Sequence, residues 1–88
     1  MAITVEVTYD MAKALGGVRR FEMADARTVA DVVRQTRERF GTEGEAFEKL
    51  TRVAAVAVNG VLSNHRKGMS TQLADGDTVT FLKAAAGG

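Results

Sequence analysis

Apolar and polar positions alternate along the first residues of the chain. Residues 3–9 place an apolar side chain at every second position, which is typical of a strand with one buried face. The alternation stops at residues 10–17, where Gly16 and Gly17 predict a turn that follows one helical turn. A second apolar stretch over residues 18–23 is interrupted in phase by its two arginines, which favours a bulge. The two stretches are expected to pair as a hairpin with a long loop.

After residue 28, apolar side chains recur at the three- to four-residue spacing of a helix instead of at every second position. Thr28, followed three residues later by Asp31, resembles a capping box whose acid favours the amides of the first turn. Gly41 stands where a left-handed C-terminal cap is expected. The sequence therefore predicts a helix laid across a sheet. Its apolar stripe consists of Val29, Val32, Val33, Thr36 and Phe40.

The middle of the chain predicts a second contact with the core and a buried strand. Residues 43–50 favour a short helical turn that places Phe47 and Leu50 on the core. Residues 53–58 are apolar on both faces, which is how a strand covered on both sides reads. We expect its alanines to lie where the helix packs closely.

Two turn sequences frame the last strands. Asn59 followed by Gly60 is the strongest short hairpin signal, and a brief strand resumes at Val61. After a polar loop over residues 63–71, the acidic turn at residues 73–77 leads into a last strand over residues 78–82. Val79 and Phe81 are expected on one face of that strand.

This order of elements predicts an α+β domain, compatible with the β-grasp (ubiquitin-like) fold. Such a domain has a mixed sheet of about four to five strands with one main helix packed on one face. We predict a single domain over residues 1–82 and a flexible tail over residues 83–88 that ends in Gly-Gly.

Composition excludes several classes of function. The chain has 45% hydrophobic and 26% charged residues, which favours folding over disorder, and its net charge of +1 gives no electrostatic case for nucleic acid or an anionic membrane. No cysteine is present, so disulfides, thiolate metal sites and a cysteine nucleophile are excluded. The N-terminus does not resemble a signal peptide, and no apolar run is long enough to span a membrane. We therefore expect a cytoplasmic protein.

Few side chains are candidates for chemistry. His65 lies in a polar loop without companion ligands or an orienting carboxylate, so an ordinary surface histidine is expected. Asp75 and Asp77 flank Gly76 and read as turn formers, and the further ligands of a calcium loop are missing. We expect neither a bound metal nor a bound cofactor, and no catalytic residue.

What remains is the C-terminal pair Gly87 and Gly88. A carboxylate is a poor electrophile, so it carries a group only after conversion to an acyl adenylate or thioester inside another protein. Reaching an active site through a narrow channel requires a tail without side-chain bulk, and glycine adds a wide range of backbone conformations. Three alanines at residues 84–86 extend the slim segment. This arrangement suits a protein substrate better than an enzyme.

With these features in their order, the chain resembles the ubiquitin-like sulfur carriers, in particular the small subunit of molybdopterin synthase and the thiamine-type carriers. The resemblance spans nearly the whole chain. It rests on the strand end at Asn59 and Gly60, the Asp-Gly-Asp turn at residues 75–77, the last strand with Phe81, and the terminal Gly87 and Gly88.

The resemblance implies a reaction sequence that partners carry out. An E1-like adenylyltransferase would use ATP to adenylate the carboxylate of Gly88, and a sulfur donor (a sulfurtransferase) would convert the adenylate to a thiocarboxylate. A downstream sulfur-accepting enzyme would consume it. Gly87, Ala86 and Ala85 would be recognised in the tail, and Leu82 would belong to a docking patch. The receiving pathway stays open among molybdopterin, thiamine, cysteine, transfer-RNA thiolation and siderophore synthesis.

Two other functions remain open from the sequence. The same tail could form isopeptide bonds with lysines of target proteins, which would make the chain a ubiquitin-like protein modifier. Alternatively, the domain could be a β-grasp interaction module in which the two glycines are incidental.

Overall fold

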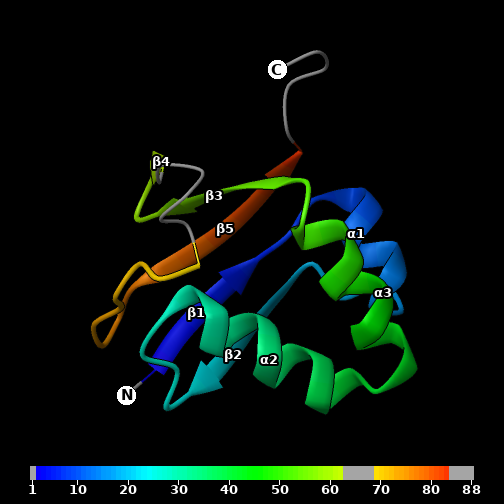
Figure 1. Ribbon diagram of the computed structural model, residues 1–88, viewed down its shortest axis with the longest axis horizontal. Helices are drawn as coiled ribbons and strands as arrows, with labels where there is room; N and C mark the ends of the chain where they lie inside the picture. Colours follow the sequence, from blue (N-terminus) through cyan, green and yellow to red (C-terminus); the bar gives the residue numbers. More distant parts are fainter. Residues whose placement is uncertain (1, 63–68, 84–88) are drawn as a thin grey trace.

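The structure, a computed structural model, describes residues 2–62 and 69–83 (Figure 1). Within these residues, five strands form one sheet in the order β2-β1-β5-β3-β4. No helix in the described part of the chain is long and apolar enough to cross a membrane. The elements in chain order are β1 (Ala2–Glu6), α1 (Tyr9–Ala14), β2 (Arg20–Ala24), α2 (Val29–Phe40), α3 (Thr42–Thr51), β3 (Ala54–Val58), β4 (Val61–Leu62) and β5 (Thr78–Lys83).

The sheet is mixed, and β5 lies at its centre. β1 and β2 pair antiparallel, which confirms the predicted hairpin with a long loop. β5 runs parallel to β1 on one side and antiparallel to β3 on the other. With helices packed against it, this sheet confirms the predicted β-grasp arrangement. In Figure 1, α2 crosses in front of β1 and β2.

One face of the sheet forms the core. The register places Val5 opposite both Phe21 and Val79, and Val56 opposite Phe81, and all of these side chains are buried. Helix α2 covers them with the predicted stripe, and α3 adds Phe47, whose ring meets that of Phe81 edge to face at 5.3 Å. Alternation along the strands thus supplies one side of the core and the helical period supplies the other.

The start of α2 is held by two sets of hydrogen bonds. Thr28 Oγ1 accepts from the Asp31 amide at 3.1 Å and the Asp31 carboxylate accepts from the Thr28 amide at 3.2 Å, which confirms the capping box. The amides of Val29 and Ala30 donate to the carbonyls of Thr71 and Met69. Amides that a helix N-terminus leaves unpaired are therefore satisfied by a segment about forty residues later in the chain.

Two details of the first hairpin differ from the prediction. β1 ends at Glu6, and Tyr9 opens α1 with its ring 62% exposed, because Thr8 Oγ1 accepts from the Met11 amide and caps a helix there. This local cap overrides the alternation. No bulge interrupts β2, since the register with β1 is continuous from Arg20 onward. β2 begins at Arg20, so the interruption of the apolar alternation between Val18 and Phe21 lies at the start of the strand and not within it.

The middle of the chain also differs from the prediction. Residues 42–51 form a ten-residue helix instead of a short turn, with Phe47 buried as expected. β3 begins at Ala54, and Val53 is 69% exposed. Ala55 and Ala57 lie on the face opposite the helices, because they pair with Leu82 and Thr80 across β5. Their small size is therefore not explained by helix packing, contrary to the prediction, which holds only for Ala54, a member of the core.

Gly44 permits the close approach of α3 to α2. A Cβ atom at this position would lie 2.6 Å from both the Cα and the carbonyl oxygen of Arg37. These are backbone atoms, so neither can rotate away. The sequence gives no periodic signal for this contact, which only the packing of the two helices creates.

We predict that Gly44→Ala destabilises the fold by about 1–3 kcal/mol, the usual cost of overpacking. In an open helix the same change would stabilise by roughly 0.5–1 kcal/mol, so the sign of the effect tests the contact. Urea unfolding measures it, with Glu45→Ala, an exposed neighbour in the same helix, as the control expected to be near neutral. A Gly44→Ala protein more stable than the wild type would contradict the packing described here.

Candidate functional site

Gly88 was predicted to carry the reacting group, and Gly87, Ala86 and Ala85 were predicted to be recognised in the tail. All four lie outside the described residues, as does His65. The described structure shows the surface that leads to them. β5 ends at Lys83, one residue beyond the predicted strand end, and Leu82 lies beside it. The division of the chain at residue 82 stays a prediction.

An apolar patch surrounds the end of β5 on the sheet face opposite the helices. Leu82 is 37% exposed and lies across from Ala55, while Leu62 is 64% exposed and lies across from Ala57. Ala55 and Ala57 of β3 lie between these two leucines, and Thr80 precedes Leu82 on the same face of β5. We call Leu62 and Leu82, together with the half-buried Ala55 and Thr80, the tail-side patch, whereas Ala57 itself is buried. The sequence predicted an apolar patch here but named only Leu82; the alternation of β3 and the position of Leu62 after the Asn-Gly turn were the signals for the rest.

The other half of the same face is charged. Glu6 on β1 lies 3.8 Å from Arg20 on β2, and Glu22 follows on β2. Both members of the ion pair are well exposed, so the pair adds little to stability. The face therefore divides into an apolar half toward residues 84–88 of the chain and a polar half at the far edge of the sheet.

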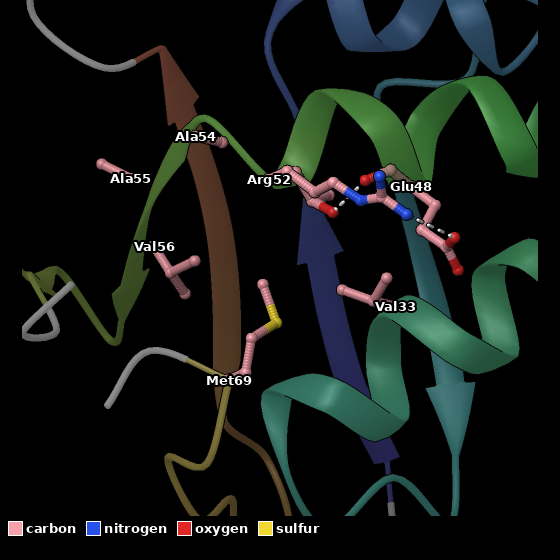
Figure 2. A pocket seen from close by; sticks show the side chains of 8 residues that line it. Val33, Glu48, Arg52, Ala54, Ala55, Val56 and Met69 are labelled. Carbon is pink, nitrogen blue, oxygen red and sulfur yellow. Dashed lines mark hydrogen bonds and ion pairs between the residues drawn. The ribbon is translucent and has the colours of Figure 1, made fainter. Parts of the chain in front are cut away.

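A cavity of about 370 Å³ lies on the helix side of β3 (Figure 2). Val33, Val56 and Met69 give it apolar walls, and Figure 2 shows Arg52 extending toward Glu48 at its rim. Glu48 lies 3.7 Å from Arg52 and 3.6 Å from Arg37. The one carboxylate that lines this cavity is therefore engaged in ion pairs with two arginines.

The two aspartates of the acidic turn are used for structure. Asp77 accepts a hydrogen bond from the Ala74 amide at 2.8 Å and from the Asn59 side chain at 2.9 Å. Asn59 in turn accepts from the Thr78 amide at 2.9 Å. Asp75 accepts from the Ala2 amide at 2.7 Å. The interpretation as a turn former is confirmed for Asp77, whereas Asp75 binds an amide at the other end of the chain. The cross-link through Asn59 was not predicted, because it joins two turns that are distant in the chain.

These hydrogen bonds lower the pKa of Asp77 below its ordinary value of 3.8, chiefly through the Ala74 amide and then through the Asn59 side chain. The pKa of Asp31 is lowered by the amide of Arg27 and further by Arg34 and Thr28. Both shifts arise from local hydrogen bonds that favour the anion. Within the described residues, no cluster of three or more potential metal ligands is found.

We predict that Asp77→Asn destabilises the protein at neutral pH and that the difference from the wild type shrinks in acid. The folded state has the lower pKa, so ionised Asp77 stabilises it fully above 3.8, and this contribution is lost as the pH falls through the folded value. Urea unfolding at neutral pH and below 3.8 measures both effects. Asp10→Asn, an exposed aspartate in the first turn of α1, is the control. A stability difference that is independent of pH would contradict this account.

Comparison with known proteins adds family information to this geometry. A model of the ThiS family matches residues 8–88. No curated protein gives a significant match.

Three solved structures are similar over nearly the full length. The BexX/CysO complex of Amycolatopsis orientalis contains a chain with 29% identity and a TM-score of 0.75, with 98% of this chain and 99% of that one covered. The complex of subunits 1 and 2 of the molybdopterin-converting factor from Helicobacter pylori gives 23% identity and a TM-score of 0.67, with both chains covered completely. Small archaeal modifier protein 1 from Methanosarcina acetivorans gives 18% identity and a TM-score of 0.78, with 99% and 96% covered.

Proposed function

The chain belongs to the ThiS family, and we propose that it is a sulfur carrier that holds sulfur as a thiocarboxylate on Gly88. The observation that carries the proposal is the family match, which extends through the final Gly-Gly. The structure supports it by placing an apolar patch at the end of β5, the strand from which the chain continues to Gly88.

The chemistry requires activation of the Gly88 carboxylate. An E1-like adenylyltransferase joins this carboxylate to the AMP portion of ATP and releases pyrophosphate, so the poor leaving group oxide is replaced by AMP. A hydrosulfide equivalent from a sulfur donor then attacks the acyl carbon and displaces AMP. The product is a thiocarboxylate, whose sulfur is softer and more nucleophilic than carboxylate oxygen. A downstream enzyme takes this sulfur.

The described part of this chain provides binding and presentation in this scheme. In the cavity beside β3 the one carboxylate is ion-paired with two arginines, and Asp77 of the acidic turn is bound to the Ala74 amide and the Asn59 side chain. The proposed carrier is therefore a substrate of its partners and not an enzyme. Residues 84–88 carry no side chain larger than a methyl group, which lets Gly88 enter a narrow active site.

We further propose that the tail-side patch docks the adenylating enzyme. Leu82 is a large apolar side chain exposed at the end of β5, the strand from which the chain continues to Gly88, and Leu62 is exposed on the same sheet face two strands away. Exposed apolar side chains at such positions are typical anchors in protein interfaces. Two of the three solved neighbours described above are protein complexes, by their descriptions, which supports a partner-dependent role.

A second candidate uses the same activated carboxyl group. Attack on the adenylate or a derived thioester by a lysine amine of another protein would form an isopeptide bond and make the chain a modifier. The fold that it shares with small archaeal modifier protein 1 is compatible with this outcome. The two candidates share the activation step and differ in the nucleophile that follows, so one experiment can separate them.

We predict that incubation with the cognate adenylating enzyme, ATP and a sulfur source exchanges one carboxylate oxygen for sulfur. Intact-mass measurement followed by fragmentation should place the sulfur on Gly88. A chain lacking Gly87 and Gly88 is the control and should stay unchanged in mass. Exchange of oxygen for sulfur with no higher-mass conjugates in cell lysates supports the carrier alone. Conjugates without exchange support the modifier. If neither product forms, the interaction module with incidental glycines is favoured.

We predict that Leu82→Asp slows adenylation of Gly88 by about tenfold or more, because loss of one buried apolar anchor costs at least ~1.4 kcal/mol of binding. Pyrophosphate release measures the rate. Val61→Asp is the matched control: Val61 is 70% exposed and adjoins Leu62 in β4, but it pairs with Val58 and so lies on the sheet face opposite the patch. Equal rates for the two variants would show that the patch does not dock the enzyme.

A further inference from the structure

The two edges of the sheet differ in how they are protected. β4 forms one edge and contains only Val61 and Leu62, so it offers a short template for another strand. β2 forms the other edge and is five residues long, and within the described residues β1 is its only strand partner. Long, unpaired edge strands are the usual sites of strand addition.

The hydrogen-bond phase of β2 is fixed by its pairing with β1. The Val7 amide donates to the Arg19 carbonyl at 3.0 Å, and the register continues through Val5 and Phe21. In an antiparallel pair, alternate residues direct their peptide groups toward the partner strand. The peptide groups of Arg20, Glu22 and Ala24 therefore point away from β1, toward the open edge.

Arg39 occupies the centre of this edge. Its Nη1 donates to the Glu22 carbonyl at 2.8 Å, and its guanidinium carbon lies 5.7 Å from the ring centroids of both Phe21 and Phe40. The side chain thus takes the hydrogen-bond acceptor that an added strand would use. Arg39 is nevertheless exposed, so its displacement requires no opening of the core.

The space beside the edge can take a strand. A groove of about 590 Å³ runs between β2 and α2, with Glu22, Asp25, Arg34, Gln35, Glu38 and Arg39 among its lining residues. Its lining is largely polar and charged, so it does not fit an apolar peptide. A strand that binds there would therefore be selected by the complementarity of its charges to this lining.

The charges on β2 are complementary to a second copy of the same strand. An antiparallel β2 pair centred on Phe21 places Arg20 of each copy opposite Glu22 of the other, with the outward peptide groups of both residues in hydrogen-bonding position. Registers centred on Arg20 or on Glu22 would instead place like charges opposite each other, which is unfavourable. Only the register centred on Phe21 satisfies the charges and the hydrogen-bond phase together.

We propose that the β2 edge is a homodimerisation surface that pairs with a second copy of this chain, and that Arg39 restrains it by occupying the Glu22 carbonyl. In the dimer, the two sheets join across β2, and Phe21 of one copy meets Phe21 of the other. Arg39 and the second copy compete for the same acceptor. The monomer is favoured as long as Arg39 holds this acceptor.

The test removes the guanidinium group and keeps the apolar stem. Arg39→Met should tighten dimerisation of the full chain by about tenfold or more relative to wild type, measured by analytical ultracentrifugation over a wide concentration range. Arg37→Met is the matched control: Arg37 lies on the same helix, is not among the residues that line the groove, and pairs with Glu48 of α3 instead of β2, so it should behave as wild type. If Arg39→Met stays monomeric over the same concentration range, the proposal is overturned.

Charge swaps test the register in the Arg39→Met background. Arg20→Glu or Glu22→Arg alone places like charges opposite each other and should abolish the added association, and the two changes combined should restore it. Association that persists in both single variants, or that the double variant fails to restore, would overturn the proposed pairing.

A second measurement leaves Arg39 in place and does not depend on the stability of that variant. The chain has no cysteine, so mixing Arg20→Cys with Glu22→Cys under mild oxidation should give mainly the mixed disulfide, identified by mass. Residues opposite each other in this register are within the range of a disulfide. An excess of either homodimer over the mixed species would exclude the register centred on Phe21.

Discussion

The position of β5 at the centre of the sheet is the constraint on which the other elements depend. β5 joins the hairpin of β1 and β2 to the hairpin of β3 and β4. Its start is fixed by backbone hydrogen bonds: the Gly76 amide donates to the Ala2 carbonyl, the Thr4 amide to the Asp77 carbonyl, and the Asn59 amide to the Thr78 carbonyl. Parallel strands cannot be joined by a tight turn, so β1 and β5 must be far apart in the sequence, and the helices and the other strands lie in the chain between them.

This fixed start decides which side chains face the helices. Because successive residues of a strand point to opposite faces, Val79 and Phe81 enter the core and Leu82 lies on the opposite face. A slip of one residue would reverse the arrangement along the whole strand. The small turn that holds β5 in register therefore also determines which side chains are exposed at Leu82, although the turn lies at the other end of the strand.

A domain of 88 residues can bury only a small core, and the buried apolar side chains form one cluster between the helices and one face of the sheet. The helices cover one sheet face, and polar groups beside that layer are held by local contacts, as in Thr36, whose hydroxyl donates to the Val32 carbonyl. The opposite face has an apolar half near the end of β5, where we propose that a partner docks, and a charged half that reaches the β2 edge. The core and the proposed docking surface thus lie on different sides of the same sheet.

The sequence by itself determined the features that depend on neighbours in the chain: the capping box of Thr28 and Asp31, the stripe of α2, the Asn59–Gly60 turn, and the inward positions of β1 and β5. It also singled out Gly88 as the candidate reacting end. Only the tertiary structure decided features that join distant segments: the full length of α3 beside Gly44, the link from Asn59 to Asp77, the outward placement of Ala55 and Ala57, and the contact of Arg39 with β2. Local patterns record hydrogen bonds and periodicity within a few residues, whereas these contacts exist only after the sheet register brings remote segments together.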